Sequence, residues 1–169
     1  MRYFNINSEN RNFDTIIYLQ GMHKNSHRKL NSITKCAWAY IIDRKKKDRV
    51  ISKQGHGENG ESGYKMNLEA LIKSMKYLIR NKLNQTHLLF VSDDQPFTTV
   101  LVNLKSDVNI NKRKYSSEWK KIKSLLVKFP NSEVLFLKKD DKNLESVFPE
   151  YYSKLSEVKN KIHNELGDR

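Results

Sequence analysis

The sequence predicts an α/β protein built on one mixed sheet of five strands, three antiparallel and then two parallel, with helices on the faces of the sheet. Two observations lead to this fold class. Five short segments carry continuous or alternating apolar residues, which is typical of strands. Between and after the later strands, apolar residues recur every three or four positions, which is typical of amphipathic helices. The resulting order is β-β-β-α-β-α-α-β-α.

The first three strands are expected at Thr15–Met22, Cys36–Asp43 and Arg49–Gln54, which are rich in β-branched and aromatic residues. The charged segment Arg44–Asp48 is expected to form a hairpin turn. Four of the six glycines lie within residues 55–63, which indicates a loop after the third strand. Three consecutive strands joined in this way favour an antiparallel meander.

A helix is expected over Asn67–Leu83, because one apolar stripe runs along it. The next segment, Thr86–Ser92, is continuously apolar, as expected of a central strand buried on both faces. Asp93-Asp94-Gln95-Pro96 then begins a short helix that extends over Phe97–Leu104, since proline suits the first turn of a helix.

Further helices are expected around Trp119 and after Phe148, with a fifth strand at Glu133–Leu137 between them. Pro130 stops the first of these helices. Each later strand follows a helix, so right-handed parallel crossovers are expected. The 169 residues lack a credible linker, and we expect a single domain over residues 1–169.

Composition narrows the function classes. The chain has 32 Lys+Arg against 19 Asp+Glu, a formal charge of +13, and its 17 aromatic residues argue against a disordered basic tail. It has one cysteine, Cys36, which argues against a disulfide scaffold or a cysteine zinc site and fits a buried small side chain. Residues 1–5 lead into polar sequence, and no apolar run approaches the length of a membrane span. We therefore expect a cytoplasmic protein in a reducing compartment, with no membrane contact and a polyanionic partner.

Two carboxylates stand where a metal site could form. Asp93 follows the buried strand, where open α/β sheets bind ligands, and Glu69 lies near the start of the preceding helix. Carboxylate oxygens are the ligands that Mg²⁺ prefers, and two such ions can assist phosphodiester hydrolysis. A purely structural role is equally consistent with these residues, because acids are favoured in first helical turns and as N-caps. Asp94 is expected to be the cap.

The chain resembles the ribonuclease H family in four segments. Ile17-Tyr18-Leu19-Gln20-Gly21-Met22 is placed like the family's first strand with its Asp-Gly-Ser, and Ala37-Trp38-Ala39-Tyr40-Ile41 is similar to its second strand. Residues 67–75 look like the helix with the catalytic Glu, here Glu69, and residues 90–97 are similar to Thr-Asp-Ser-x-Tyr-Val, with Asp93 at the catalytic Asp. The resemblance implies a ribonuclease H-like fold, an RNA/DNA hybrid as substrate, and Mg²⁺ or Mn²⁺ if the chain is active.

Several positions depart from the family pattern. Gln20 stands where the family's first Asp binds both metals, and a neutral amide offers a weaker ligand than a carboxylate. Asp14 lies six residues upstream, about 20 Å along a strand, and is too distant to substitute. Glu150 is nearest in spacing to the family's last Asp, while Asp140 or the adjacent Asp141 offers an additional acid in what is otherwise a solvated turn. The metal ligands implied by the resemblance are thus Glu69, Asp93, Gln20 and Glu150.

The resemblance also implies a nucleic-acid surface. The connector, residues 105–123, carries seven cations, and some family members have a basic protrusion here that grips the DNA strand of a hybrid. Neutralised phosphates release counterions, so such a segment binds polynucleotides most tightly at low salt. The residues expected to contact nucleic acid are Lys112, Arg113, Lys114 and Tyr115 in the connector, Lys45 and Lys46 in the first hairpin, and Asn67 near the family's RNA-reading Asn pair.

Three functions remain open from sequence. The first is a nucleic-acid-binding protein of ribonuclease H-like fold with weakened or lost hydrolysis, whose partner is an RNA/DNA hybrid or structured RNA. The second is an active metal-dependent nuclease that uses Glu69, Asp93 and Asp140 as catalytic acids. The third is a regulatory module that binds an acidic protein and no nucleic acid. Gln20, which stands in place of the family's first Asp, favours the first of these three functions.

Overall fold

A computed structural model describes residues 1–8, 11–25 and 29–167 of the chain. Its sheet has six strands among these residues, in the order β1-β6-β5-β2-β3-β4. Their bounds are as follows: β1 Arg2–Tyr3, β2 Thr15–His23, β3 Cys36–Arg44, β4 Arg49–His56, β5 Leu88–Ser92 and β6 Ser132–Phe136. Strands β2, β3 and β4 form an antiparallel meander, whereas β5 pairs parallel to β2 and β6 parallel to β5. The mixed α/β sheet predicted from sequence is confirmed.

The sixth strand, β1, was not expected. It has two residues and pairs parallel to the start of β6. A segment this short has no hydrophobic period for a sequence pattern to detect.

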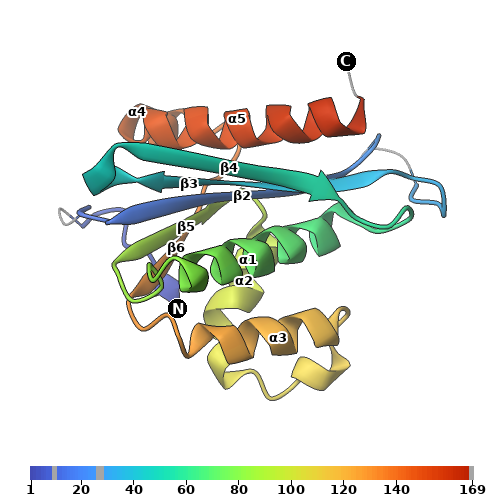
Figure 1. The fold of residues 1–169 in the computed structure, drawn as a ribbon, viewed down its shortest axis with the longest axis horizontal. Helices are drawn as coiled ribbons and strands as arrows, with labels where there is room; N and C mark the ends of the chain where they lie inside the picture. The colour runs from blue at the N-terminus through green and yellow to red at the C-terminus, as the bar shows by residue number, and fades with distance from the viewer. Residues whose placement is uncertain (9–10, 26–28, 168–169) are drawn as a thin grey trace.

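The helices cover both faces of the sheet (Figure 1). They are α1 Gly63–Arg80, α2 Gln95–Asn103, α3 Ser116–Leu126, α4 Lys142–Val147 and α5 Pro149–Leu166, with short 3-10 turns η1 Lys45–Lys47, η2 Leu104–Ser106 and η3 Ile110–Lys112. Figure 1 shows α5 on one face and α1 on the other, with α3 beyond α1 on the side away from the sheet. Helix α5 packs on β2, β3 and β4, while α1 packs on β2 and β3.

Helix α1 begins four residues earlier than its apolar stripe suggested. The side chain of Ser62 accepts a hydrogen bond from the amide of Lys65 at 3.1 Å, which caps the helix at Gly63. At its first turns α1 lies directly against β2: a Cβ added at Gly21 would lie 2.2 Å from the amide nitrogen of Asn67. Glycine at position 21 is therefore what allows the helix backbone to approach the strand.

Two apolar clusters, one on each face of the sheet, form the core. Trp119, around which a helix was expected, is 1% exposed and belongs to the cluster on the α1 face. Cys36 is a free, buried thiol, also as expected. In the part of the chain that the structure describes, no helix is long and apolar enough to span a membrane.

Candidate functional site at the C-terminal edge of the sheet

A cleft of about 900 Å³ lies where the parallel strands β2, β5 and β6 reach their C-terminal ends. The parallel register pairs Tyr18 with Val91, which brings Gln20 to the level of Asp93. Both side chains line the cleft, together with Asn67 from α1 and Asp94 from the start of α2. This is the edge at which open α/β sheets bind ligands.

Asp94 is the N-cap of α2, as expected. Its Oδ1 accepts a hydrogen bond from the amide of Phe97 at 3.0 Å, and its Oδ2 accepts one from Nδ2 of Asn67 at 2.8 Å. Burial raises the pKa of Asp94, although these two hydrogen bonds oppose the shift. Burial, followed by the Asp94 carboxylate, also raises the pKa of the neighbouring Tyr64 to about 12.

Two amide oxygens in the cleft have no hydrogen-bond donor among the described residues: Oε1 of Gln20 and Oδ1 of Asn67. Gln20 is 7% exposed and Asn67 is 3% exposed. The orientation of the Asn67 amide is fixed, because only its nitrogen can donate to the Asp94 carboxylate. Buried acceptors without a donor are uncommon in folded proteins, so this cleft has capacity to accept hydrogen bonds from a bound group or water.

Asp93 is held by two lysines. Nζ of Lys159, from α5, lies 2.5 Å from Oδ2 of Asp93, and Nζ of Lys139, from the loop after β6, lies 3.7 Å from the same oxygen. The Asp93 side chain is 5% exposed, so this carboxylate is paired within the protein rather than solvated. A second groove, of about 520 Å³, continues from Asp93 and Lys159 along α5.

Neither Lys159 nor Lys139 was expected from the sequence. Lys159 extends the face of α5 that contains Tyr152 and Leu155, at spacings of three and four residues, and all three line the second groove. This spacing is the sequence feature from which Lys159 could have been placed on the same face of α5 as Tyr152 and Leu155. His23 also lines the cleft, and its Nδ1 accepts a hydrogen bond from the amide of Gly63 at 3.1 Å.

The structure does not bring Glu69 to the cleft. Residues two positions apart on a helix point about 200° apart, so the face of α1 that carries Asn67 toward the cleft carries Glu69 away from it. Glu69 follows Lys65 by one turn, and the charges of Glu69, Glu61 and Glu118 act together on Lys65. Of these two α1 residues, Asn67 lines the cleft and Glu69 does not.

Glu150 is also remote from Asp93. It bonds Lys45, whose ammonium group also lies 2.9 Å from Asp43. It stands in the first turn of α5, nine residues or about 14 Å before Lys159 along the helix axis. The match in spacing to the family's last Asp therefore selected a residue remote from Asp93, since Lys159 is the α5 residue that reaches Asp93.

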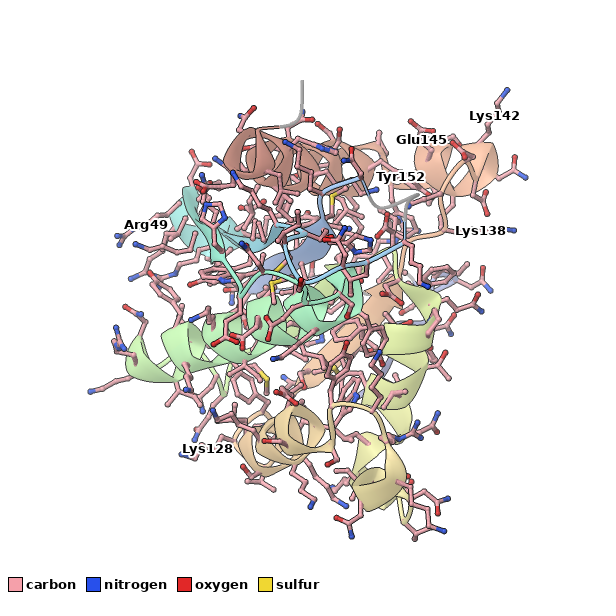
Figure 2. All side chains as sticks on the ribbon, turned by 90° about the vertical axis from the view of Figure 1, so that its right-hand side faces the viewer. Arg49, Lys128, Lys138, Lys142, Glu145 and Tyr152 are labelled. Atoms are coloured by element: carbon pink, nitrogen blue, oxygen red, sulfur yellow. The ribbon has the colours of Figure 1, made fainter. Side chains whose placement is uncertain are left out.

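The loop after β6 brings one expected acid near the site. Asp140 is exposed, has a positive φ of 57° and lines the second groove together with Asp93. Asp141 caps α4 through a hydrogen bond from the amide of Leu144 at 2.9 Å. The hydroxyl of Tyr152 donates to the carbonyl of Lys138, and Figure 2 shows these two residues on the side of the molecule opposite Arg49.

These residues do not fit a pair of divalent cations. Among the described residues, no three His, Cys, Asp or Glu side chains are grouped closely enough to hold a metal ion. The cleft offers the carboxylates of Asp93 and Asp94, and both oxygens of Asp94 already accept hydrogen bonds within the protein. The expected ligand set of Glu69, Asp93, Gln20 and Glu150 is therefore not assembled.

Comparison with solved structures identifies the architecture. The chain matches the solution structure of the PFV RNase H domain with a TM-score of 0.64 and 12% identity, covering 86% of this chain and 92% of that one. The chain has the ribonuclease H-like fold. It also matches LC9-RNase H1, described as a type 1 RNase H with the type 2 active-site motif, with a TM-score of 0.66 and 9% identity over 90% and 72% of the two chains. LC11-RNase H1 in complex with RNA/DNA hybrid matches with a TM-score of 0.56 and 12% identity over 79% and 92%. No protein-family model and no curated protein matches the sequence.

In this ribonuclease H-like fold the basic connector lies beside the cleft. The hydroxyls of Tyr115 and Ser62 are 2.6 Å apart, and the ring of Tyr115 stacks on Tyr64, which lines the cleft. Nζ of Lys114 lies 5.2 Å from the centre of the Tyr115 ring. The two rings and this ammonium group are thus packed on one another, and the hydroxyl contact ties the connector to the start of α1.

The other connector cations differ in their pairing. Arg113 forms an ion pair with Asp107, whereas Lys112 and Lys114 have exposed side chains. The ion pair with Arg113 lowers the pKa of the Asp107 carboxyl. Of the three connector cations expected to contact nucleic acid, Lys112 and Lys114 are therefore better placed than Arg113 to meet a polyanion.

The first hairpin lies at the opposite end of the sheet from the cleft. Lys45 is paired with Asp43 and Glu150, and Nζ of Lys46 lies 2.5 Å from Asp14. These side chains follow the C-terminal end of β3, which is antiparallel to β2 and so lies beside the N-terminal end of β2. The hairpin and the connector do not form one surface around the cleft.

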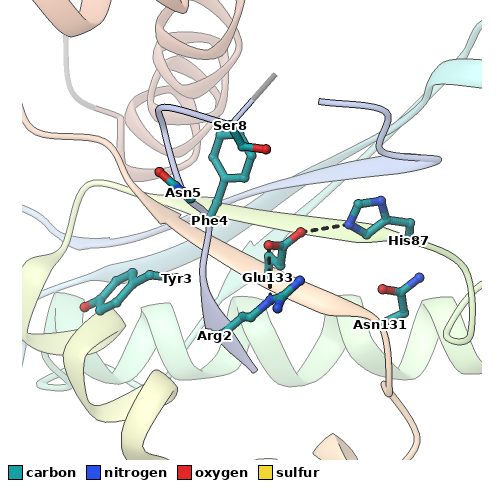
Figure 3. Close-up of a pocket in the computed structure, with 8 residues that line it drawn as sticks. All are labelled: Arg2, Tyr3, Phe4, Asn5, Ser8, His87, Asn131 and Glu133. Carbon is teal, nitrogen blue, oxygen red and sulfur yellow. Dashed lines mark hydrogen bonds and ion pairs between the residues drawn. The ribbon is translucent and has the colours of Figure 1, made fainter. Parts of the chain in front are cut away.

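A second cavity, of about 480 Å³, lies at the N-terminal edge of the parallel strands (Figure 3). Glu133 is its central residue: its carboxylate lies 2.8 Å from Nε2 of His87 and 3.4 Å from Nε of Arg2. Nδ1 of His87 lies 3.1 Å from the carbonyl of Asn12. The side chains of Arg2, His87 and Glu133, all of which line this cavity, are thus bonded to one another.

Proposed function

We propose that this chain is a nucleic-acid-binding protein of ribonuclease H-like fold in which phosphodiester hydrolysis is lost. The observation that carries the proposal is the state of Asp93, whose carboxylate is bonded by Lys159 and flanked by Lys139. Around it, the neutral amides of Gln20 and Asn67 stand where a metal-dependent site needs charged ligands.

The proposed partner is an RNA/DNA hybrid or a structured RNA. The net charge of +13 favours a polyanion, and the exposed cations of the connector lie beside the cleft. Neighbours of the same fold support this choice, since one was solved with RNA/DNA hybrid and foamy viral protease-reverse transcriptase was solved with both dsDNA and RNA/DNA hybrid.

A binding series tests the partner. Anisotropy of labelled hybrid, duplex RNA and duplex DNA, each measured across a range of salt concentrations, should show affinity that falls steeply with salt. Replacing Lys112, Arg113 and Lys114 by Ala should weaken binding to every sequence and reduce the salt slope by about 2 to 3. The matched control replaces Lys47, Arg49 and Lys53 by Ala, which removes the same charge from exposed positions of the first hairpin and β4. Equal losses in both variants would contradict a connector interface, and no binding by the native chain would favour the protein-interaction module.

A cleavage assay tests the loss of hydrolysis. The same substrates incubated with Mg²⁺ or Mn²⁺ should remain intact under conditions where they are fully bound. Cleavage that disappears in Asp93→Asn would instead establish the alternative, an active metal-dependent nuclease.

A further inference from the structure

The pairing of Asp93 with Lys159 is built into the packing of α5. Tyr151, Leu155, Val158 and Ile162 are buried along one stripe of this helix, which fixes its position on the sheet. Glu150 is bonded by Lys45 near the start of the same helix. With both features fixing α5, the residue that reaches the C-terminal end of β5 is Lys159.

The two ammonium groups around Asp93 leave little net negative charge that could attract a free cation. Both ammonium groups approach the same oxygen, Oδ2 of Asp93, and the Lys159 side chain is itself only 27% exposed. Gln20 and Asn67 add oxygen ligands but no negative charge. A divalent ion entering here would face the ammonium group of Lys159 across a short distance, and repulsion between like charges is strong where water is largely excluded.

Asn67 and Asp94 reinforce this arrangement. The Asn67 amide donates to Asp94, so a carboxylate at position 67 would face a second carboxylate at the cap of α2. The Asp94 carboxylate at the cap of α2 therefore favours a neutral amide, which can donate a hydrogen bond, at position 67. The cleft combines neutral oxygens with an internally paired carboxylate, and its residues complement one another without a metal ion.

We propose that the ammonium group of Lys159 is a built-in cation that takes the place of a divalent ion at Asp93. The site then binds no divalent metal in the native chain, and polynucleotide binding does not depend on one. The second statement rests on the proposed nucleic-acid function, whereas the first concerns the protein alone.

Mn²⁺ binding by the purified full chain tests the first statement. The loss of the free Mn²⁺ signal in electron paramagnetic resonance should show no saturable site in the native chain. The variant Gln20→Asp/Lys159→Asp removes the ammonium group and adds two carboxylates, and it should bind Mn²⁺ at least about tenfold more tightly than the native chain. The matched control is Gln20→Asp/Lys161→Asp, which changes the net charge equally but at a position about 200° around α5 from Lys159.

The outcomes separate clearly. Tight Mn²⁺ binding by the native chain that is lost in Asp93→Asn would overturn the proposal, and so would equal gains in the test and control variants. Thermal melting checks that each variant folds. If the double variant does not fold, Lys159→Gln alone should still show a gain in Mn²⁺ affinity that Lys161→Gln lacks.

Polynucleotide affinity measured with EDTA and with Mg²⁺ at matched ionic strength tests the second statement. Equal affinities are expected, and a requirement for Mg²⁺ would overturn it. Absence of polynucleotide binding under both conditions would defeat the proposed function but leave the Mn²⁺ result standing.

Discussion

The two edges of the parallel strands carry similar side chains in different states. At the N-terminal edge, Asp14 accepts hydrogen bonds from Lys46 and from the amide of His87, and Glu133 is bonded by His87 and Arg2. Each of these two carboxylates therefore has two partners within the protein. At this edge, the polar groups therefore bond neighbouring segments of the sheet to one another.

At the C-terminal edge, some buried hydrogen-bond acceptors have no donor among the described residues. Asp93 and Asp94 are bonded within the protein, but the buried oxygens of Gln20 and Asn67 have no donor among the described residues. Burying an acceptor without a donor costs about 1 to 3 kcal/mol, so a fold that keeps two such oxygens in one cleft sacrifices stability there. The contrast between the edges indicates that the C-terminal edge is the one suited to bind something.

The largest expected difference between the two edges is the loss of stability that follows replacement of a lysine at each edge. Lys159→Met keeps the aliphatic stem but leaves the Asp93 carboxylate, which is 5% exposed, without its nearest cation. We expect a loss of about 2 kcal/mol in the free energy of unfolding, below the range for fully buried pairs because Lys159 keeps some solvent contact. Lys46→Met removes an 81% exposed ammonium group from Asp14 and should cost less than about 1 kcal/mol. Urea denaturation measures both, and equal costs would show that the Asp93 pair is no more than a surface ion pair.

The fold was readable from the sequence because it follows from periodicity. The continuous apolar run before Asp93 and the stripe after Asn67 fixed a buried strand and its neighbouring helix. Site geometry depends on finer features. Ser62 caps α1 within a glycine-rich segment that resembled a loop, so the sequence pattern did not show where α1 begins. Nor did the pattern show that the rotation of α1 on the sheet places Asn67, and not Glu69, at the cleft.

Lys159 is a second site residue that the sequence alone did not predict. It lies 66 residues from Asp93 in sequence, and only the packing of α5 on the sheet brings the two together. A lysine on an amphipathic helix is ordinarily solvated, so its type alone gave no indication of a buried partner. Asp93 and Asp94 could be placed from sequence because they directly follow a buried strand, and Gln20 could be placed because the first strand resembles that of the ribonuclease H family.

A smaller difference should appear in the pH dependence of stability. The hydrogen bond from Lys46 and that from the His87 amide lower the pKa of Asp14 from 3.8, so its contribution is present above that value and is lost as pH falls through the folded-state pKa. Burial raises the pKa of Asp94, so its contribution has the opposite sign: it is present below 3.8 and is lost as pH rises through the folded-state pKa.

Stability measured from acid to neutral pH should show these opposite slopes. The difference between the native chain and Asp14→Asn should grow in favour of the native chain as pH rises from acid, by less than about 1 kcal/mol because Asp14 is partly exposed. The difference for Asp94→Asn should change in the other direction. Slopes of the same sign would contradict the assignment of Asp94 as a desolvated carboxyl, whatever constant offset the substitutions introduce.

The smallest expected effect on stability distinguishes the two edges most directly. Gln20→Met replaces a buried amide whose oxygen has no donor by an apolar side chain of similar length, and we expect a change within about 1 kcal/mol of zero, in either direction. Glu133→Met, the control at the other edge, removes the acceptor of His87 and Arg2 and should be clearly destabilising. If the free oxygen of Gln20 serves a bound nucleic acid, Gln20→Met should also weaken hybrid binding while thermal stability is retained. Loss of stability without loss of affinity would assign Gln20 a structural role and remove the distinction between the two edges.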